Sequence, residues 1–270
     1  MKQLLLIVSA LTAIACDLCN LQSCNCKKHI NCEHPSETMS SACPAGAKLM
    51  DTNEEMQVEI LNEHNTARDL IASGNFLSFP PAIYMATMQW SAELAELARK
   101  NVLRCKLEFD GCRNTKDLHF VGQLLGRYEY PKIINYKTLN MIHKIIVLWF
   151  SEYKYATNIQ IDNYPVTVER GRDIRHFGQL SKDDATHVGC AGIHFIKNNT
   201  RTFIFCCNYN QRCVPGYTIY DHHGGPASKC DMGRNPAYTN LCSVDEPYTK
   251  VNDYNHFRKE GRKENEQPIA

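Results

Sequence analysis

The sequence predicts an α+β fold that is rich in disulfide bonds. Three segments repeat apolar residues at helical spacing, and two adjacent segments within residues 187–209 are rich in β-branched and aromatic residues. Fourteen cysteines in 270 residues, with 43% hydrophobic residues, indicate one substantial core held by covalent links. The formal charge of +1 for the whole chain predicts no strong electrostatic steering toward nucleic acid or an anionic membrane.

The N-terminus predicts export. Lys2 precedes a short apolar run, and Ala13 and Ala15 provide the small residues that a signal peptidase accepts. We therefore expect a signal peptide at residues 1–15, cleaved near 15/16, and a secreted, extracellular protein. In that compartment the cysteines are expected to pair with one another. No later run reaches about 18 apolar residues, so no transmembrane segment is predicted.

The first predicted elements are an arm and a helix. Residues 17–53 are rich in cysteine but show little apolar periodicity, so this arm cannot form a core alone. A helix is predicted from Glu54, because acidic residues favour a helix N-terminus and apolar residues then recur at helical spacing. Gly74 fits its C-terminal end.

Two more helices are predicted further along the chain. Ser91 is a suitable N-cap for the second, which continues to the segment before Cys105. The third covers residues 138–155, with Glu152 at the edge of its apolar stripe and facing inward. Residues 106–136, between these helices, are predicted to form a loop.

A β-hairpin is predicted from HVGCAGIHFI and RTFIFCCNY, joined by KNNT. If these four residues form the loop, Ile196 faces Arg201 and Cys190 faces Cys207. Opposed residues of an antiparallel pair lie within disulfide reach, so the register predicts a Cys190–Cys207 bridge. Asn198 begins an N-N-T sequon at the hairpin end, and we expect it to be a glycosylation site.

The C-terminal part of the chain divides into two segments. Residues 213–248 are rich in Pro, Gly and Cys and indicate a small extension in which Cys230 pairs with Cys242. Residues 249–270 are charged and are expected to form a flexible tail.

Several motifs in order resemble one known family. EHNTAR is followed by MQWSAELAELARKNVLRC, CKLEFDGC, VGQLL, WFSE, RHFGQL with VGCA, and CCNY. Their order and spacing resemble the CAP superfamily (SCP/antigen 5/PR-1). The cysteine-rich arm and GGPASKC…NPAYTNLC resemble its insect branch, the antigen 5-like, venom allergen-like proteins of flies.

The resemblance implies a three-layer α-β-α sandwich around a small, mainly antiparallel sheet, with the CAP domain at residues 54–212. It also implies three bridges that fasten the arm, namely Cys19–Cys32, Cys24–Cys112 and Cys43–Cys105. The pairing of Cys16, Cys26, Cys206 and Cys213 stays open, with a bridge from Cys26 to Cys206 or Cys213 as one guess.

The family also implies a central cleft lined by two histidines and two acidic residues, which in some members binds a divalent metal. The four corresponding positions here are Phe109, Gln123, Glu152 and His176. Since only the last two keep the family's residue types, we expect no metal site, no cofactor and no catalytic residue. His176 is then expected to hydrogen-bond Glu152 or the backbone.

The residues therefore predict a secreted, non-enzymatic binding protein with a degenerate cleft. Its expected partner is an extracellular protein or lipid, in a reproductive or defence secretion by family analogy. One alternative is a metal-dependent or hydrolytic enzyme using Glu152 and His176, with His119 or His187 as a replacement ligand. Another alternative is a sterol or lipid carrier.

Other polar pairs suggest chemistry less strongly. His64 and Arg68 lie one turn apart on the first helix and are expected to serve packing and surface pairing. The adjacent His222 and His223 lie in a Gly-Pro loop and are expected to be exposed. Cysteine catalysis would require a free thiolate in a chain built to oxidise its cysteines.

Overall fold

The structure is a computed structural model that describes residues 18–248 except 26, 35–36, 166 and 168–170. The predicted signal peptide, Cys16, Cys26 and the predicted tail lie outside these residues. Within the described part of the chain, no helix is both long enough and apolar enough to cross a membrane.

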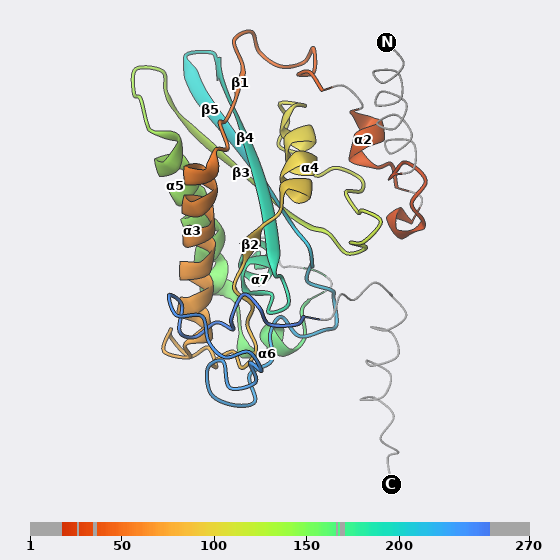
Figure 1. The fold of residues 1–270 in the computed structure, drawn as a ribbon. Helices are drawn as coiled ribbons and strands as arrows, with labels where there is room; N and C mark the ends of the chain where they lie inside the picture. Colours follow the sequence, from red (N-terminus) through yellow and green to blue (C-terminus); the bar gives the residue numbers. More distant parts are fainter. Residues whose placement is uncertain (1–17, 26, 35–36, 166, 168–170, 249–270) are drawn as a thin grey trace.

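A mainly antiparallel sheet forms the middle layer (Figure 1). Its strands follow the order β1-β4-β5-β3, and a short fifth strand, β2, pairs in parallel with β4. The strands are β1 (Lys48–Leu49), β2 (Gln89–Trp90), β3 (Gly122–Pro131), β4 (His187–Lys197) and β5 (Thr200–Tyr209).

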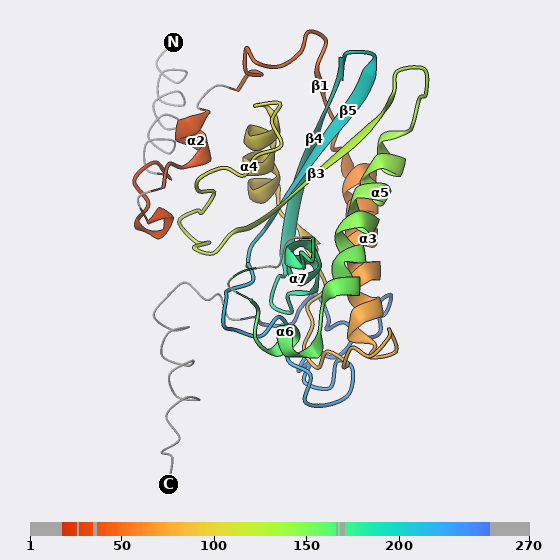
Figure 2. The same ribbon diagram turned by 180° about the vertical axis from the view of Figure 1, so that it is seen from behind.

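Helices cover both faces of the sheet, which gives the α-β-α sandwich (Figures 1 and 2). On one face lie α3 (Glu54–Ala72), α5 (Thr138–Phe150) and α7 (Arg175–Ser181), and on the other lies α4 (Ala92–Val102). The shorter helices are α2 (Ile30–Glu33) and α6 (Asn158–Asp162), with single 3-10 turns at Gln22–Cys24 and Ser151–Tyr155. The fold class predicted from the sequence is confirmed.

Local sequence explains where the long helices begin and end. The Asn53 side chain accepts a hydrogen bond from the Met56 amide at the start of α3, and the Ser91 side chain accepts one from the Leu94 amide at the start of α4. Beyond α3, Gly74 adopts a φ of +70°, a conformation that favours glycine. The predicted Ser91 cap is therefore confirmed.

The β4–β5 hairpin has the predicted register, with Ile196 opposite Arg201 and Cys190 opposite Cys207. Its loop is shorter than predicted, because Lys197 pairs with Thr200 and only Asn198 and Asn199 form the turn. Both asparagines have positive φ, 49° and 60°, as a two-residue hairpin turn requires.

The predicted loop at residues 106–136 is wrong in its second half, where β3 pairs with β5 over ten residues. The segment GQLLGRYEYP is buried from Gly122 to Gly126, because α5 covers one face and α4 the other. A strand buried on both faces does not alternate polar and apolar residues, so periodicity could not reveal it.

Five disulfides connect ten of the twelve described cysteines. The structure joins Cys19 to Cys32, Cys24 to Cys112, Cys43 to Cys105, Cys190 to Cys207 and Cys230 to Cys242. Cys206 and Cys213 are free thiols in the described part of the chain, and the guessed bridge from Cys26 involves a residue outside it.

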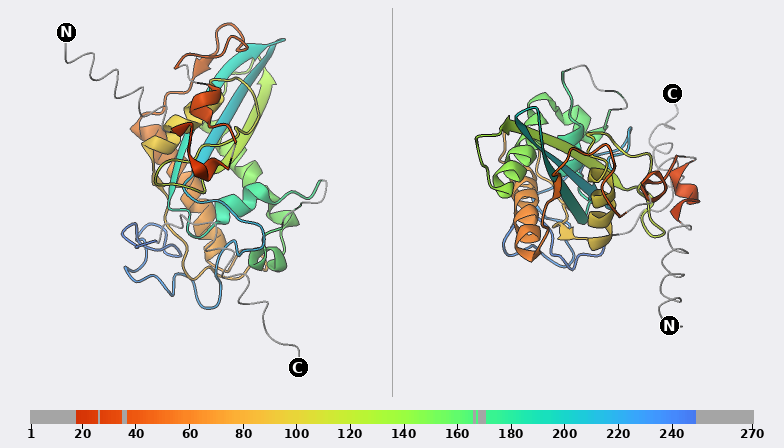
Figure 3. Two further views of the ribbon diagram at one scale, coloured as in Figure 1. Left: turned by 90° about the vertical axis from the view of Figure 1, so that its right-hand side faces the viewer. Right: turned by 90° about the horizontal axis from the view of Figure 1, so that it is seen from above.

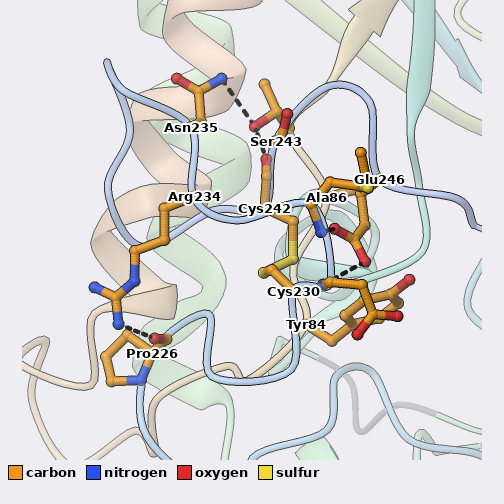
Figure 4. The surroundings of a disulfide bond; sticks show 12 residues. Tyr84, Ala86, Pro226, Cys230, Arg234, Asn235, Cys242, Ser243 and Glu246 are labelled. Atoms are coloured by element: carbon orange, nitrogen blue, oxygen red, sulfur yellow. Dashed lines mark hydrogen bonds between the residues drawn. A yellow bond between two sulfur atoms is a disulfide. The ribbon is translucent and has the colours of Figure 1, made fainter.

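The C-terminal extension is part of the fold and packs into the core. Ile219, Tyr220 and Leu241 are buried in one apolar cluster with residues of α3 and α7. Around the Cys230–Cys242 bridge, the Glu246 carboxylate accepts hydrogen bonds from the amides of Asp231 (2.9 Å) and Met232 (2.8 Å) (Figure 4).

The close approach of α4 to β4 depends on Gly189. A Cβ atom there would lie 2.1 Å from the backbone nitrogen of Ala95 in α4 and 2.4 Å from the backbone oxygen of Ser91, the N-cap of α4. We expect Gly189→Ala to lower the free energy of unfolding by about 2–3 kcal/mol, because the helix must move. Guanidinium unfolding checks this, with Gly225→Ala as the control since a Cβ there meets nothing within 4 Å. Equal stability of the two variants would contradict the expectation.

Candidate functional site

A cavity of about 420 Å³ opens beside α7 and the start of β3. The wall is largely apolar, and no aspartate or glutamate among the described residues lines it. Its apolar side chains are Leu107, Phe109, Val121, Leu124 and Leu125. We call this cavity the central cleft, because Phe109, Gln123 and His176 all line it.

The fourth position, Glu152, lies behind His176 and does not line the central cleft. One carboxylate oxygen, Oε1, is 2.6 Å from Nδ1 of His176. Because a carboxylate only accepts hydrogen bonds, Nδ1 carries the ring proton and donates a hydrogen bond to Oε1. The other oxygen accepts hydrogen bonds from the amides of His176 (2.7 Å) and Phe177 (3.2 Å). Glu152 therefore caps the N-terminus of α7, where Ile174 offers no capping side chain.

Packing fixes the orientation of the His176 ring. The ring lies nearly parallel to that of Trp149, with 5.9 Å between the centroids and 9° between the planes. Together with the Glu152 contact, this stacking directs Nε2 of His176 away from the carboxylate. Nε2 has no hydrogen-bond partner within the described chain. Of the polar side-chain atoms of His176 and Glu152, only Nε2 is therefore available to a ligand.

Gln123 is held in a buried amide network. Its Nε2 donates to Oδ2 of Asp110 (2.7 Å) and to Oδ1 of Asn208 (2.9 Å). Oδ2 of Asp110 also accepts from Asn101 (2.8 Å), and Oδ1 accepts from Arg113 (2.6 Å). Because both donors of the Gln123 amide are used, this residue braces the wall of the central cleft.

Phe109 is the most exposed of the four positions, with 56% of its surface accessible. The next residue, Asp110, is buried in the amide network of Gln123. The chain therefore passes from the exposed mouth of the cleft to that buried network between two adjacent residues. A phenyl ring has no atom that can bind a metal or carry a proton, and it adds apolar surface where the family implies an imidazole.

Three arginines also line the central cleft, and each has a local partner. Arg113 pairs with Asp110 (2.6 Å), Arg175 pairs with Asp173 (2.5 Å), and the Arg212 guanidinium lies 5.8 Å from the Phe120 ring centroid. The Asp173 contact raises the pKa of Arg175 above its usual value, although partial burial opposes this.

His64 is a structural residue. Its Nδ1 donates to the Ile60 carbonyl (2.7 Å) and its Nε2 accepts from the Tyr209 hydroxyl (2.9 Å). Burial lowers the pKa of His64 to about 4, which leaves the ring neutral at physiological pH. The sulfurs of Cys190 and Cys207 lie within 4.8 Å of it, but they are joined to each other and cannot bind a metal.

Arg68 corrects the predicted surface pairing, since its side chain is fully buried. The guanidinium donates to the carbonyls of Ala86, Leu180, Lys182 and Asp183 at 2.8–3.2 Å. Burial lowers the pKa of Arg68 to about 10, so it stays charged at neutral pH. Sequence reasoning missed this because all four carbonyls come from segments distant in sequence.

The suggested replacement ligands do not reach His176. His119 lines a cavity next to the arm, and His187 lines another cavity beside the C-terminal extension. His222 and His223 lie together in a loop, where their rings stack and each contacts an aspartate. His223 is exposed as predicted, whereas His222 is mostly covered.

The free thiol of Cys213 lines the central cleft. Burial raises the pKa of Cys213 to about 12, so the thiol stays protonated at neutral pH and is a poor nucleophile. Cys206 is buried on the sheet face opposite the Cys190–Cys207 bridge, and burial also raises its pKa.

The four family positions do not supply a metal site. Phe109 offers no ligand atom, the Gln123 amide is engaged, and both Glu152 oxygens accept hydrogen bonds. A catalytic zinc requires about three protein ligands, and only Nε2 of His176 remains available. Two further residues, which the sequence did not single out as site residues, hold these positions in place. Asp110 accepts a hydrogen bond from Gln123, and Trp149 stacks on His176.

The structure is an α-β-α sandwich with five disulfides among the described cysteines and a His176–Glu152 pair beside an apolar cleft. The chain belongs to the cysteine-rich secretory protein family, CAP, whose match covers residues 61–209.

Relatives in flies resemble most of the chain. It is 34% identical to venom allergen-1 of Aedes albopictus over 238 residues, covering 88% of this chain and 91% of that protein. It is 38% identical to the antigen 5 like allergen Cul n 1 of Culicoides nubeculosus over 170 residues, covering 63% and 75%. The resemblance to dipteran antigen 5-like proteins is therefore confirmed.

Solved structures support the fold. NaASP2 with Zn²⁺ matches with a TM-score of 0.55 and 21% identity, covering 75% of this chain and all of that one. BmVAL-1 matches with a TM-score of 0.57 and 22% identity, covering 74% and 97%.

Proposed function

We propose that this protein is a secreted, non-enzymatic CAP protein that binds an extracellular protein or lipid partner in its central cleft. One observation carries the proposal, namely that Phe109 stands in the mouth of the cleft where the family has a metal-binding histidine. The predicted signal peptide, the five disulfides and the named allergen relatives support an extracellular setting.

The shape and lining of the cleft favour binding over catalysis. A largely apolar pocket with few polar groups suits an apolar ligand or an inserted side chain. The two groups best placed for proton transfer, Glu152 and His176, bond each other, and Glu152 also caps α7. The five apolar side chains of the wall favour a lipid as one candidate ligand.

Ligand capture by matched variants tests this function. Phe109→Asp places a charge at the mouth, and we expect it to remove any lipid or protein that co-purifies with the wild-type protein. Leu77→Asp is the control, because Leu77 is also exposed and does not line the cleft. Mass spectrometry of both preparations gives the readout, and co-purifying molecules unaffected by Phe109→Asp would contradict the role of the cleft.

Zinc binding separates this proposal from the metal-dependent alternative. We expect no stoichiometric zinc on the wild-type protein by calorimetry, and Phe109→His to raise zinc affinity at least about tenfold by adding a second imidazole. His176→Ala in that background should abolish the gain. One equivalent of zinc on the wild-type protein, lost in Glu152→Ala, would instead establish the metal-dependent alternative.

A further inference from the structure

The loop between β3 and α5 exposes two isoleucines. Ile133 is 94% exposed and Ile134 is 37% exposed. A fully exposed isoleucine leaves apolar surface in water that would gain roughly 1.5–3 kcal/mol on burial. Two adjacent residues of this kind at a loop end suggest a partner that covers them.

This loop lies against the turn of the β4–β5 hairpin. The Lys132 amide donates to the Asn199 carbonyl (2.9 Å), and Nε of Arg201 donates to the Lys132 carbonyl (3.0 Å). Ile196, also exposed, precedes the turn. We call the surface formed by residues 131–137 and 196–201 the isoleucine tip, and Figure 3 shows it at one extremity of the molecule.

The isoleucine tip is uniformly basic. It contains Lys132, Lys137, Lys197 and Arg201, and neither of its segments contains an aspartate or glutamate. Within the described part of the chain, no carboxylate forms an ion pair with these four cations. The carboxylate nearest along β3, that of Glu129, lies 3.7 Å from Nε of Arg127 and outside the tip.

Folding does not account for this charge pattern. Lys137 occupies the N-cap position of α5, makes no side-chain capping bond there, and places a cation at the positive end of the helix dipole. The first turn of α5 has no acidic residue to offset it. The ring of Tyr136 in the tip meets that of Tyr130, which directly precedes the tip, edge to face with centroids 5.0 Å apart. Tyrosines beside lysines are typical of a membrane–water interface.

We propose that the isoleucine tip docks on an anionic lipid bilayer. Ile133 and Ile134 enter the boundary between headgroups and acyl chains, while the four cations contact lipid phosphates and carboxylates. Charge complementarity favours an anionic surface, and the exposed isoleucines favour a bilayer over a soluble polyanion, which would not cover them.

Vesicle co-sedimentation tests the proposal with the full mature chain. The protein carries Thr200→Ala, which removes the sequon and keeps both asparagines of the turn. We expect binding to phosphatidylcholine vesicles with 30% phosphatidylserine at about 0.1 M salt, and little binding to phosphatidylcholine alone. Ile133→Ser with Ile134→Ser should weaken binding at least about tenfold, and Lys132→Ala or Lys197→Ala roughly fivefold each.

Matched controls lie at the far end of the molecule. Ile159→Ser changes an isoleucine that is 78% exposed on α6, and Lys154→Ala changes a nearby lysine, so neither should alter binding. A tryptophan probe reports insertion directly, since Ile133→Trp fluorescence should shift to the blue and be quenched by brominated lipids. Ile159→Trp should show neither effect.

Two results would overturn the proposal. One is absence of binding to phosphatidylserine vesicles at low salt. The other is binding that depends on Lys132 and Lys197 but not on the isoleucines, together with equal binding to soluble heparin, which would make the tip a polyanion site.

The sequon gives an independent check. A glycan on Asn198 would stand between the isoleucine tip and a bilayer, because Asn198 lies in the turn itself. Protein recovered on vesicles from a glycosylating host should therefore lack the glycan, as measured by mass spectrometry. A vesicle-bound fraction that is fully glycosylated at Asn198 would count against docking through this surface.

Discussion

Arg68→Ala is expected to lower the free energy of unfolding by about 3–5 kcal/mol, among the largest effects of any single change in this protein. The guanidinium makes five hydrogen bonds to four carbonyls and joins α3 to the segments around residues 86 and 182. Without it these carbonyls remain buried with fewer donors, and a cavity opens beside α3.

Guanidinium denaturation followed by circular dichroism measures this loss. Arg127→Ala is the matched control, because the Arg127 side chain is about half exposed. This change removes only one ion-pair contact, that of 3.7 Å with Glu129. That change should cost less than about 0.5 kcal/mol. If Arg68→Ala lowered the free energy of unfolding no more than the control does, the hydrogen bonds of the buried guanidinium would not stabilise the fold as proposed.

Removal of two nested disulfides is expected to have a still larger effect. Cys24–Cys112 closes a loop of 88 residues, and Cys43–Cys105, with a separation of 62, lies inside it. With the inner bridge intact, the outer one closes a circuit of only about 26 residues, so replacing Cys24 and Cys112 by alanine should cost about 3.5 kcal/mol. Replacing all four cysteines should cost about 8 kcal/mol, most of a typical domain's stability.

Thermal and denaturant unfolding under non-reducing conditions tests this nesting on three variants, which lack the Cys24–Cys112 bridge, the Cys43–Cys105 bridge or both. Replacement of Cys230 and Cys242 serves for comparison, since its isolated loop of 12 residues predicts about 3 kcal/mol. A four-cysteine variant about as stable as either two-cysteine variant would show that the bridges do not act on the unfolded chain as nested loops.

Sequence patterns predicted the three long helices and the β4–β5 hairpin. The spacing of apolar residues located α3, α4 and α5, and the hairpin register placed Cys190 opposite Cys207. The strand at Gly122–Pro131 was missed because its buried first half does not alternate polar and apolar residues and, unlike β4 and β5, the segment GQLLGRYEYP contains no β-branched residue.

The candidate site was predictable in its membership but not in its arrangement. The family motifs located Phe109, Gln123 and His176, which do line one cavity. The position of Glu152 behind His176 depends on how a 3-10 turn meets the start of α7, and the amide network of Gln123 depends on Asn208 in β5. Such contacts join segments far apart in sequence, so no local pattern encodes them.

The capping role of Glu152 has an evolutionary consequence. A residue that both serves a reaction and holds a helix end can be selected for the second task after the first has gone. In this chain Phe109 and Gln123, neither of which caps a helix, differ from the residue types that the family implies at those positions. The presence of Glu152 and His176 alone therefore does not separate retained chemistry from helix anchoring, and proteins with the same pair should be sorted by the residue that occupies the mouth of the cleft.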